Sequence, residues 1–484
     1  MFRIPLLMGL FLLCLGCSVG PDYQRPQDFS DDEIARSLGL KPQSGTLIRP
    51  DWYKEFHDET LNKLAEKGLQ ESPTVQKALA NMKQARYQLF IERAGFLPSF
   101  DLQGKYLNSK ENGANHSSLK SEYYLAGLDA SWEIDIWGGQ RRLTEHAKAI
   151  FESAAANYDD VRLSLLSEIA AEYMNWRLAQ KTLFIVEKNL ELQREIFETV
   201  KEQYRAGLAD ELAYEQAQSV LHSTEMKVPT LRTQEKAAQN ALSVLTGQLP
   251  ADFFYEQKNI LDQPDTFDIA LFTDLPADII RNRPDVQAAE QNLVAQNALI
   301  GHAVAQLFPS VSLSGLLGYQ NGKFSPLIGP DFDAHSASAV ISLPLLHWGA
   351  LINQVRAQKE ATQSALADYQ ITLLTAASEL SNSLKSIREE KIRNKAARKS
   401  MLSTEKILKL SRQKYQSGLI EFSDVLTAEQ NKLEAEQAYL QSTASIYLNI
   451  ISFFKAAGGG FALNRNTQAC QKDEKAAGGA PYTN

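Results

Sequence analysis

The stretch YYLAGLDASWEIDIWGGQ, residues 123–140, decides the fold because it joins two kinds of structure. Up to residue 136 apolar and polar positions alternate strictly, which predicts a β-strand. From Gln140 to Ala206 there is neither Gly nor Pro, which predicts one very long helix that starts where the strand ends. One strand face holds Tyr124, Ala126, Leu128, Ala130, Trp132, Ile134 and Ile136, and the other holds Gly127, Asp129, Ser131, Glu133 and Asp135.

This strand has the length and the pattern of a membrane strand. Tyr124 to Ile136 spans 13 residues, and a tilted strand needs about 9–11 residues to cross a bilayer. The carboxylates of the polar face are tolerable only against water, while Trp132 and Trp137 suit a membrane interface. A soluble sandwich would need a second sheet to cover the apolar face. The pattern therefore predicts an outer-membrane β-strand with one face in lipid and the other in a lumen.

The chain repeats itself at a fixed offset of 211 residues, which indicates a tandem duplication. We place the copies at residues 73–247 and 284–458. The matching positions are Pro73 and Pro284, Pro98 and Pro309, Gly104 and Gly315, Trp137-Gly138 and Trp348-Gly349, Tyr204 and Tyr415, Gly207 and Gly418, and Gly247 and Gly458.

Each copy presents the same elements in the same order. A helix begins at a Pro in its first turn and is stopped by a second Pro before a pair of strands. In copy one we expect strands at 99–106 and 123–136, with the polar residues 108–122 as a loop. In copy two we expect strands at 310–319 and 336–348, the latter with Ala337, Ala339, Ile341, Leu343 and Leu345 on one face.

Long helices follow the strands in both copies. Residues 140–206 and 350–417 contain no Gly or Pro, so each helix reaches about 100 Å. Gly207 and Gly418 are the expected turns, because Gly accepts the left-handed conformation that ends a helix. Helices then return toward residues 246 and 457, and we expect Pro229 to kink the first of them.

Four strands per chain cannot close a barrel, since the smallest membrane barrels have about eight. Open strand edges in lipid leave backbone groups unpaired. The chain must therefore oligomerise, although the pattern does not choose between two, three or four copies. The predicted fold class is an α+β membrane protein, a transmembrane β-barrel with four strands per chain that is continued by a long α-helical barrel.

The N-terminus is typical of an exported lipoprotein. Residues 1–16 are read as a signal peptide whose apolar run of 12 residues is too short to span a bilayer. Cys17 is the expected lipid attachment site, and Ser18 after it favours delivery to an outer membrane. The alternative is an ordinary secretory signal with an incidental Cys17, because Cys14 is atypical at its position.

The remaining segments complete the domain assignment. Residues 17–72 form a lipid-anchored N-terminal segment, 248–283 a linker and 459–484 a C-terminal tail. Cys470 alone remains free, so no internal disulfide is expected.

Composition excludes several function classes. A net charge of −8 without a Lys/Arg run argues against nucleic-acid binding. The seven His residues show no metal-ligand spacing, so we expect no metal and no cofactor beyond the lipid. No nucleophile elbow, phosphate loop or paired acid site suggests an enzyme.

Four motifs together resemble the TolC-type outer-membrane efflux ducts, in particular the lipid-anchored OprM- or NodT-like branch. They are CSVGPDYQRP at 17–26, SWEIDIWGG at 131–139, LPADIIRNRPDV at 275–286 and YQSGLIEFSDVLTAEQ at 415–430. The resemblance implies a homotrimer in the outer membrane with a periplasmic helical tunnel. It also implies a periplasmic adaptor, an inner-membrane transporter that we expect to be proton-driven, and export without chemistry of its own.

The resemblance further implies a gate at the periplasmic tips, where the helix pairs turn at Gly207 and Gly418. Tyr415 and Asp424 carry over from the family's latch, with Tyr204 and Asp210 as candidates in copy one. The latch is incomplete, because Ile420, Thr427 and Ala213 replace its other polar positions. Alternatively, Asp424 is only a solvent-exposed acid on the helix surface, and Tyr415 only packs at the helix turn.

Trp137-Gly138 and Trp348-Gly349 are expected to lock the strand-to-helix corners rather than to bind a substrate. Asp129, Glu133 and Asp135 are expected simply to face the lumen, with a role in tuning selectivity as the alternative. Two other functions stay open for the chain, a protein-secretion duct of the same architecture and a structural envelope lipoprotein.

Overall fold

The computed structural model describes residues 18–26, 49–112, 118–250, 278–324 and 333–461, together with Phe29, Glu33, Arg36 and Leu261. Residues 1–16, Cys17, most of the linker 248–283 and the tail beyond residue 461 lie outside the described residues. The chain divides into two compact units. The first comprises residues 1–26, 81–155 and 288–370, and the second comprises residues 27–80, 156–287 and 371–484.

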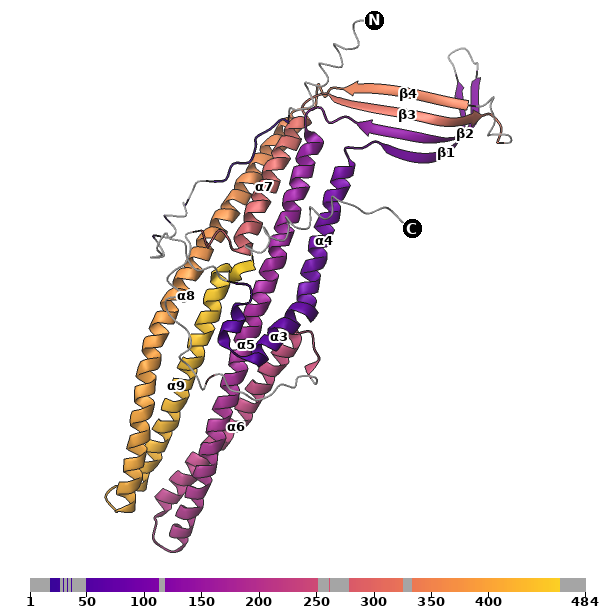
Figure 1. The fold of residues 1–484 in the computed structure, drawn as a ribbon. Coiled ribbons are helices and arrows are strands. Elements are labelled where there is room, and N and C mark those ends of the chain that lie inside the picture. Colours follow the sequence, from indigo (N-terminus) through magenta and orange to yellow (C-terminus); the bar gives the residue numbers. More distant parts are fainter. Residues whose placement is uncertain are drawn as a thin grey trace. The chain divides into compact units, whose positions relative to one another are not determined.

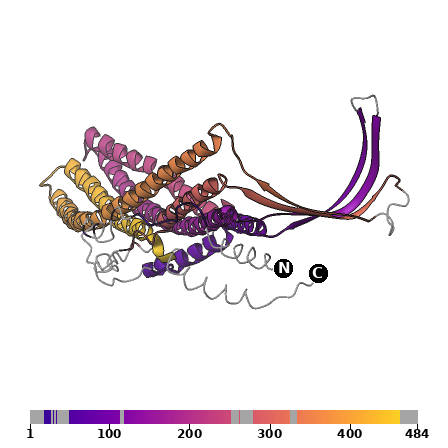
Figure 2. The ribbon, with the colours of Figure 1, turned by 90° about the horizontal axis from the view of Figure 1, so that it is seen from above.

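A single antiparallel sheet of four strands dominates the first unit (Figure 1). Its order follows the chain, so β2 pairs with β3 and joins the two copies of the duplication. Among the described residues no strand pairs with the outer edge of β1 or of β4, and the sheet curves strongly when seen from above (Figure 2). The strands are β1 (Ser99–Asn112), β2 (Ser118–Glu133), β3 (Ser310–Asn321) and β4 (Asp333–Ser342).

The polar stretch 108–122, expected as a loop, is mostly strand. Asn108 pairs with Glu122, and the ladder continues to Asn112 and Ser118. Alternation reveals a strand only when one of its faces is buried, whereas a hairpin with water on both faces needs no apolar residues. The loop expectation was therefore wrong except around residues 113–117, which lie outside the described residues.

Two strands end earlier than expected. β2 stops at Glu133, three residues before Ile136, because the backbone then turns into the helix that follows. β4 stops at Ser342, which leaves Leu343 and Leu345 outside the strand. Pro344 has no N–H to donate to a ladder, so the strand cannot extend through it.

The helices of the two copies match residue for residue. α5 (Gly139–Arg205) and α8 (Ala350–Gln416) each have 67 residues, and α6 (Glu211–Leu245) and α9 (Phe422–Ala456) each have 35. α4 (Pro73–Ala94) and α7 (Pro284–Ala305) begin at the expected prolines. Pro229 lies inside α6. Among the helices of the described segments, none combines the length and hydrophobicity that a membrane span requires.

The core of the second unit is built around the N-terminal segment, which sequence periodicity did not resolve. The 3-10 helix η1 (Trp52–Phe56) stacks Trp52 on Phe454 of α9 at 4.9 Å between ring centroids. α3 (Glu59–Glu71) is capped by Asp58, whose carboxylate also accepts a hydrogen bond of 2.7 Å from the Tyr173 hydroxyl. The segment thus ties α9 and α5 together.

A buried arginine organises the start of the second copy. The Arg283 side chain is 8% exposed and pairs with Asp285 at 2.7 Å and Glu379 at 2.8 Å. It also donates to the carbonyl oxygen of Ala456 at 2.9 Å. Each of the three guanidinium nitrogens therefore has an acceptor, as a buried charge requires.

Asp160 belongs to the same electrostatic cluster but receives too little compensation. Burial, and next the negative charge of Asp285, raise the pKa of its carboxyl, and Lys455 and Arg283 only partly oppose this. An acid whose pKa is raised by folding favours the folded state below its unfolded pKa of about 3.9 and loses that contribution as pH rises.

We expect the Asp160→Asn variant to melt at a higher temperature than the wild type at neutral pH, since the amide carries no buried charge. The advantage should shrink as pH falls toward 4, where Asp160 is itself protonated. Thermal melts of the detergent-solubilised protein between pH 4 and 8 measure this. A constant difference across that range would contradict the assignment.

Candidate functional site

The cross-strand register separates the sheet into an apolar and a polar face. Leu102 pairs with Leu128, Leu128 with Leu317, and Leu313 with Ala339, so these side chains share one face. Leu102 is 86% exposed and Ile341 is 73% exposed. Such a face is stable only against lipid or another apolar surface. Its other large members are Phe100, Tyr106, Tyr124, Trp132, Val311 and Tyr319.

The opposite face carries a row of serines across all four strands. Ser99 pairs with Ser131, Ser131 with Ser314, and Ser314 with Ser338. Neighbouring hydroxyls are hydrogen bonded, at 2.8 Å between Ser99 and Ser131 and at 2.7 Å between Ser314 and Ser338. The row gives the polar face a continuous belt of groups that can exchange hydrogen bonds with water or a passing solute.

Acidic side chains lie on both sides of this serine row. Asp101 and Asp129 are direct cross-strand neighbours, and Glu133 lies on the same face beyond Ser131. Like charges directly opposite each other destabilise a sheet, so this pair requires water. The alternation is not perfect, because Leu125, Leu316 and Val340 also fall on the polar face.

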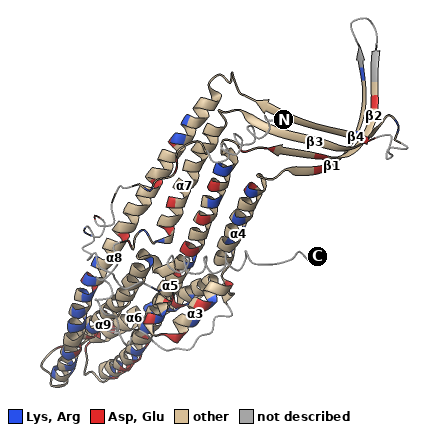
Figure 3. Cartoon of the chain, turned by 45° about the horizontal axis from the view of Figure 1, so that its top comes forward, with Lys and Arg blue, Asp and Glu red and all other residues tan. Residues whose placement is uncertain are grey.

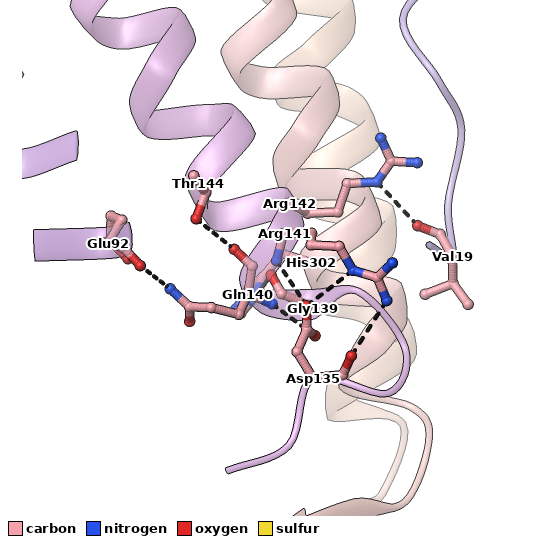
Figure 4. Close-up of polar contacts among 9 residues, drawn as sticks. All are labelled: Val19, Glu92, Asp135, Gly139, Gln140, Arg141, Arg142, Thr144 and His302. Atoms are coloured by element: carbon pink, nitrogen blue, oxygen red, sulfur yellow. Dashed lines mark hydrogen bonds and ion pairs between the residues drawn. The ribbon is translucent and has the colours of Figure 1, made fainter. Parts of the chain in front are cut away.

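The first strand-to-helix corner is held by Asp135 (Figure 4). Its carboxylate accepts hydrogen bonds from the backbone N–H groups of Gln140 at 3.1 Å and Arg141 at 3.0 Å. It also forms an ion pair of 3.2 Å with the Arg141 side chain. Asp135 therefore caps the N-terminus of α5, and the expectation that it only faces the lumen was wrong.

Trp137 and Gly138 complete this corner. The Trp137 indole stacks on Phe308 at 4.7 Å and donates a 2.8 Å hydrogen bond to the carbonyl oxygen of Pro309. Gly138 has a φ of 81°, and a side chain there would meet Ser18. Trp137 thus connects the corner of copy one to the end of α7 in copy two, whereas Gly138 leaves room for the N-terminal segment at Ser18.

The N-terminal residues 18–26 lie across the same corner. Val19 donates to the carbonyl oxygen of Trp137 at 3.0 Å, and the nearly buried Arg142 reaches the carbonyl oxygen of Val19 at 3.2 Å (Figure 4). Arg25 forms an ion pair of 2.7 Å with Glu290 of α7. The residues next to Cys17 are therefore fixed at the junction of sheet and helices.

Trp348 does not lock the second corner within its own chain. It is 88% exposed, with a φ of 50°, beside Gly349 with a φ of 76°. The reason lies in the sheet order, because β4 is an edge strand and no further strand of the described chain pairs with it. Trp137 contacts Phe308 and Pro309, and the residues 211 positions before these two are Leu97 and Pro98. Leu97 is 70% exposed.

We expect Trp348 to stack on Leu97 of the next copy of the chain, as Trp137 does on Phe308. Trp348→Ala should lower the temperature at which the oligomer dissociates in SDS gels, because truncating a packed Trp costs about 3–5 kcal/mol. Trp52→Ala, inside the core of one chain, should instead lower the amount of folded protein. An unchanged dissociation temperature for Trp348→Ala would contradict the packing.

The tip of the first hairpin places its candidates close together. The Tyr204 ring stacks on Tyr214 at 5.3 Å, and Gly207 has a φ of 71°. Leu208 donates to the carbonyl oxygen of Gln203 at 2.8 Å, which closes the end of α5. Asp210 accepts a 2.8 Å hydrogen bond from the backbone of Ala213 and so caps α6.

The tip of the second hairpin differs in its acid. Tyr415 contacts Phe422 at 5.5 Å, and Gly418 has a φ of 69°. Asp424 lies in the first turn of α9 and is exposed. It makes no side-chain hydrogen bond or ion pair with any described residue, so its charge is available at the tip.

One ion pair near the tip of the second hairpin is not predicted by any sequence pattern. Arg412 of α8 forms a 2.7 Å ion pair with Glu429 of α9, whose side chain is 2% exposed. The second carboxylate oxygen of Glu429 has no partner among the described residues. No periodicity marks a pair 17 residues apart, and the equivalent Lys201 and Gln218 cannot form it.

Comparison with known proteins identifies the family whose sequence model matches the chain. The model of the outer membrane efflux protein family matches residues 64–248 and again residues 275–459. Nodulation protein T of Rhizobium leguminosarum bv. viciae is 28% identical over 460 residues, which cover 93% of this chain and 92% of that protein. The toluene efflux pump outer membrane protein TtgC of Pseudomonas putida is 27% identical, with 92% and 93% coverage.

Solved structures give the same result. The outer-membrane channel OprN superimposes with a TM-score of 0.84 at 29% identity, covering 92% of this chain and all of that one. The CmeC outer membrane channel of Campylobacter jejuni superimposes with a TM-score of 0.84 at 27% identity, with 95% and 98% coverage.

Proposed function

Because the chain belongs to the outer membrane efflux protein family, we propose that it is the passive exit duct through which toxic small solutes leave the cell. The protein is an outer-membrane channel, a homotrimer whose helical part extends into the periplasm, and it works with a periplasmic adaptor and an inner-membrane pump. The observation that carries the proposal is the two-faced sheet, apolar on one side and lined with serine and acidic side chains on the other.

The direct test is deletion of the gene in the bacterium that encodes it. We expect sensitivity to a panel of dyes, solvents and antibiotics to rise at least fourfold, and a plasmid copy to restore resistance. Purified trimer should conduct ions in planar bilayers. Loss of a secreted polypeptide from the medium with unchanged drug sensitivity would favour a protein-secretion duct. If the purified trimer does not conduct ions and the deletion leaves drug sensitivity unchanged, a structural lipoprotein would be the function that remains.

The proposed duct carries out no reaction and holds no cofactor. Family members are channels rather than enzymes. Energy would come from the inner-membrane pump, which we propose is proton-driven. Efflux that stops on collapse of the proton gradient while ATP is maintained would support this, and efflux that follows ATP alone would contradict it.

The proposal includes a lipid on Cys17, at the end of signal peptide 1–16. Support comes from the neighbouring residues, since Ser18 lies beside Gly138 and Val19 bonds to Trp137 at the strand-to-helix corner. An acyl chain attached there would enter the membrane leaflet at the base of the sheet. Mass spectrometry of the mature N-terminus should find acylated Cys17, and a free Ser18 or an intact signal would contradict it.

We also propose that the tips form the gate, with Asp424 and Tyr415 in one hairpin and Tyr204 in the other. Three Asp424 carboxylates around one axis would attract cations and repel each other. The Asp210 carboxylate already caps α6. Asp210 is therefore a weaker candidate for the gate than Asp424. Neutralising Asp424 with Asn should change single-channel conductance, and an identical conductance would make it a solvated acid.

A further inference from the structure

The first hairpin (α5 and α6) contains a helix break that the second hairpin (α8 and α9) lacks. Pro229 lies inside α6, where α9 has Leu440 at the 211-residue offset. Proline has no backbone N–H, so it donates nothing to the carbonyl oxygen of Glu225, which its ring also crowds. The Thr233 hydroxyl donates to the carbonyl oxygen of Pro229 at 2.9 Å, and such a bond to the preceding turn favours bending of a helix.

Two ion pairs between α5 and α6 lie on either side of this break. Arg232 pairs with Glu187 at 2.7 Å, and nearer the tip Arg194 pairs with Glu225 at 3.1 Å. Figure 3 shows that basic and acidic positions both occur along this hairpin. Residues 188–193 of α5 lie between the two pairs and therefore level with the proline. Within the described part of the chain, their side chains form no hydrogen bond or ion pair.

Two polar side chains of this segment are enclosed without a hydrogen-bond partner. Gln193 is 4% exposed, and neither its Oε1 atom nor the Nδ2 atom of Asn189 meets a partner among the described residues. An unsatisfied buried polar group costs about 1–3 kcal/mol. Both atoms are already covered within one chain, so a neighbouring copy cannot supply the partner. A bend that admits water to them would offset part of this cost.

The other side of α6 has room for such a bend. A groove of about 330 Å³ lies between α6 and α9 at the level of the proline. Both helices belong to one chain, so the groove forms without a neighbouring copy. Tightly packed protein contains few voids larger than a water molecule, and a helix beside a larger one can shift into it. The groove is lined by Ser223, Met226, Lys227, Thr230, Leu231 and Gln437.

The second hairpin is held more firmly at the corresponding level. Thr404 stands where α5 has Gln193, and its hydroxyl donates to the carbonyl oxygen of Met401 at 2.9 Å. Nearer the tip, Arg412 and Glu429 link α8 to α9 through their 2.7 Å ion pair. The unpaired second oxygen of Glu429 lies beside this ion pair and not beside a helix break. The two hairpins therefore differ in stiffness although their helices are equal in length.

We propose that Pro229 and residues 188–193 form a hinge about which the tip of the first hairpin bends, and that this bending widens the periplasmic end of the duct. The inference rests on the gate proposed above. The part beyond the hinge is about 25 Å long at about 1.5 Å per residue. A bend of about 20°, as at a proline kink, would displace the turn at Gly207 by about 9 Å. The second hairpin stays straight.

Distances between spin labels test the hinge. Leu208 and Leu419 occupy the same position in the two tips, and each is replaced by a labelled cysteine in a Cys470→Ser background. In the purified trimer, the distribution of distances between copies should be at least twofold wider at position 208 than at position 419. Pro229→Leu should narrow it at least twofold at 208 and leave it unchanged at 419. The control Gln234→Leu introduces the same side chain into α6, keeps the proline and should change neither.

Efflux connects the hinge to opening of the duct. In the deletion strain that carries its native adaptor and pump, Pro229→Leu should lower ethidium efflux at least fourfold, with SDS-resistant trimer in normal amount. Asn189→Leu with Gln193→Leu removes both unpaired polar atoms, keeps the proline, and should also narrow the distribution at position 208.

The outcomes separate the hinge from the proposed function. Equal distributions at position 208 in the wild type and in Pro229→Leu would overturn the hinge. A narrowed distribution with efflux within twofold of the wild type would overturn its role in opening. Failure of the wild-type plasmid to restore efflux would instead overturn the proposed function.

Discussion

Replacing Gly318 by valine is expected to abolish assembly of the trimer. Gly318 of β3 lies directly opposite Gly127 of β2, at the joint between the two copies. A Cβ atom on Gly318 would overlap the carbonyl oxygen of Ala126 and the Cα atom of Gly127. Both are backbone atoms, so no side chain can move aside and the strands must separate. We expect the SDS-resistant trimer of Gly318→Val to fall at least tenfold.

Gly315 of the same strand provides the matched control. A Cβ atom at Gly315 has the Ser336 carbonyl oxygen as its nearest atom, at 3.5 Å. Valine favours strands, so Gly315→Val should leave trimer formation near the wild-type level. If Gly318→Val and Gly315→Val assembled equally, the close approach of β2 and β3 at Gly318 would be refuted.

Replacing Arg283 by methionine is expected to destabilise the second unit by about 3–5 kcal/mol, the usual cost of removing one partner from a buried ion pair. The change keeps an unbranched apolar stem but leaves Asp285, Glu379 and the Ala456 carbonyl oxygen without their donor. The carboxyl of Asp160 would also lose a positive neighbour that lowers its pKa. Thermal melts of the solubilised protein at neutral pH measure the loss.

Two further variants separate this effect from a general loss of charge. Arg393→Met breaks an exposed pair with Glu390, in which the arginine side chain is 58% exposed, and should cost less than about 1 kcal/mol. Asp160→Asn added to Arg283→Met should recover part of the stability, because one uncompensated charge is removed. Equal losses for Arg283→Met and Arg393→Met would show that the buried network contributes nothing special.

The duplication made most of the fold predictable. Once Trp137-Gly138 and Trp348-Gly349 were matched, each uncertain element in one copy could be checked against the other. The helix bounds follow because Pro73, Pro284, Gly207 and Gly418 impose backbone conformations whatever surrounds them. Alternation over residues 124–132 predicted the apolar face of β2, and the register bears this out.

The strand ends were less predictable, since alternation continues to Ile136 although the backbone turns earlier. Asp135 looked like one more polar-face acid, but its carboxylate caps α5. Trp348 shows the same limit, because its sequence context equals that of Trp137 and only the sheet order reveals that β4 is an edge strand, which leaves Trp348 exposed.

No periodic pattern in the sequence predicts the long-range side-chain contacts of the second unit. Trp52, Asp58 and Tyr173 are brought to their partners from segments more than a hundred residues apart. Arg283 lies in the helix-start motif RNRPDV, in which the sequence pattern explains only Asp285, as an acid in the first turn of a helix. A buried charge is recognised by its partners, and those partners lie in α8 and at the end of α9.

The central claim is that the free edges of β4 and β1 meet between copies and close one barrel. Within the chain, Ala130 of β2 faces Gly315 of β3. The offset of 211 residues transfers this pair to Ile341 of β4 and Gly104 of β1 in the next copy. Ile341 is 73% exposed and Gly104 has open space beside it, so both positions accept a cysteine.

Disulfide cross-linking in membranes tests this most directly. In a Cys470→Ser background, the chain with Ile341→Cys and Gly104→Cys should give a covalent trimer on non-reducing gels of boiled samples, and reduction before boiling should return it to monomer. The control pairs Ile341→Cys with Lys105→Cys, whose side chains fall on opposite faces of the sheet, and should stay monomeric. A covalent trimer from the first pair alone is the predicted result. Monomer from both pairs, or equal cross-linking by both, would contradict the closed barrel in this register.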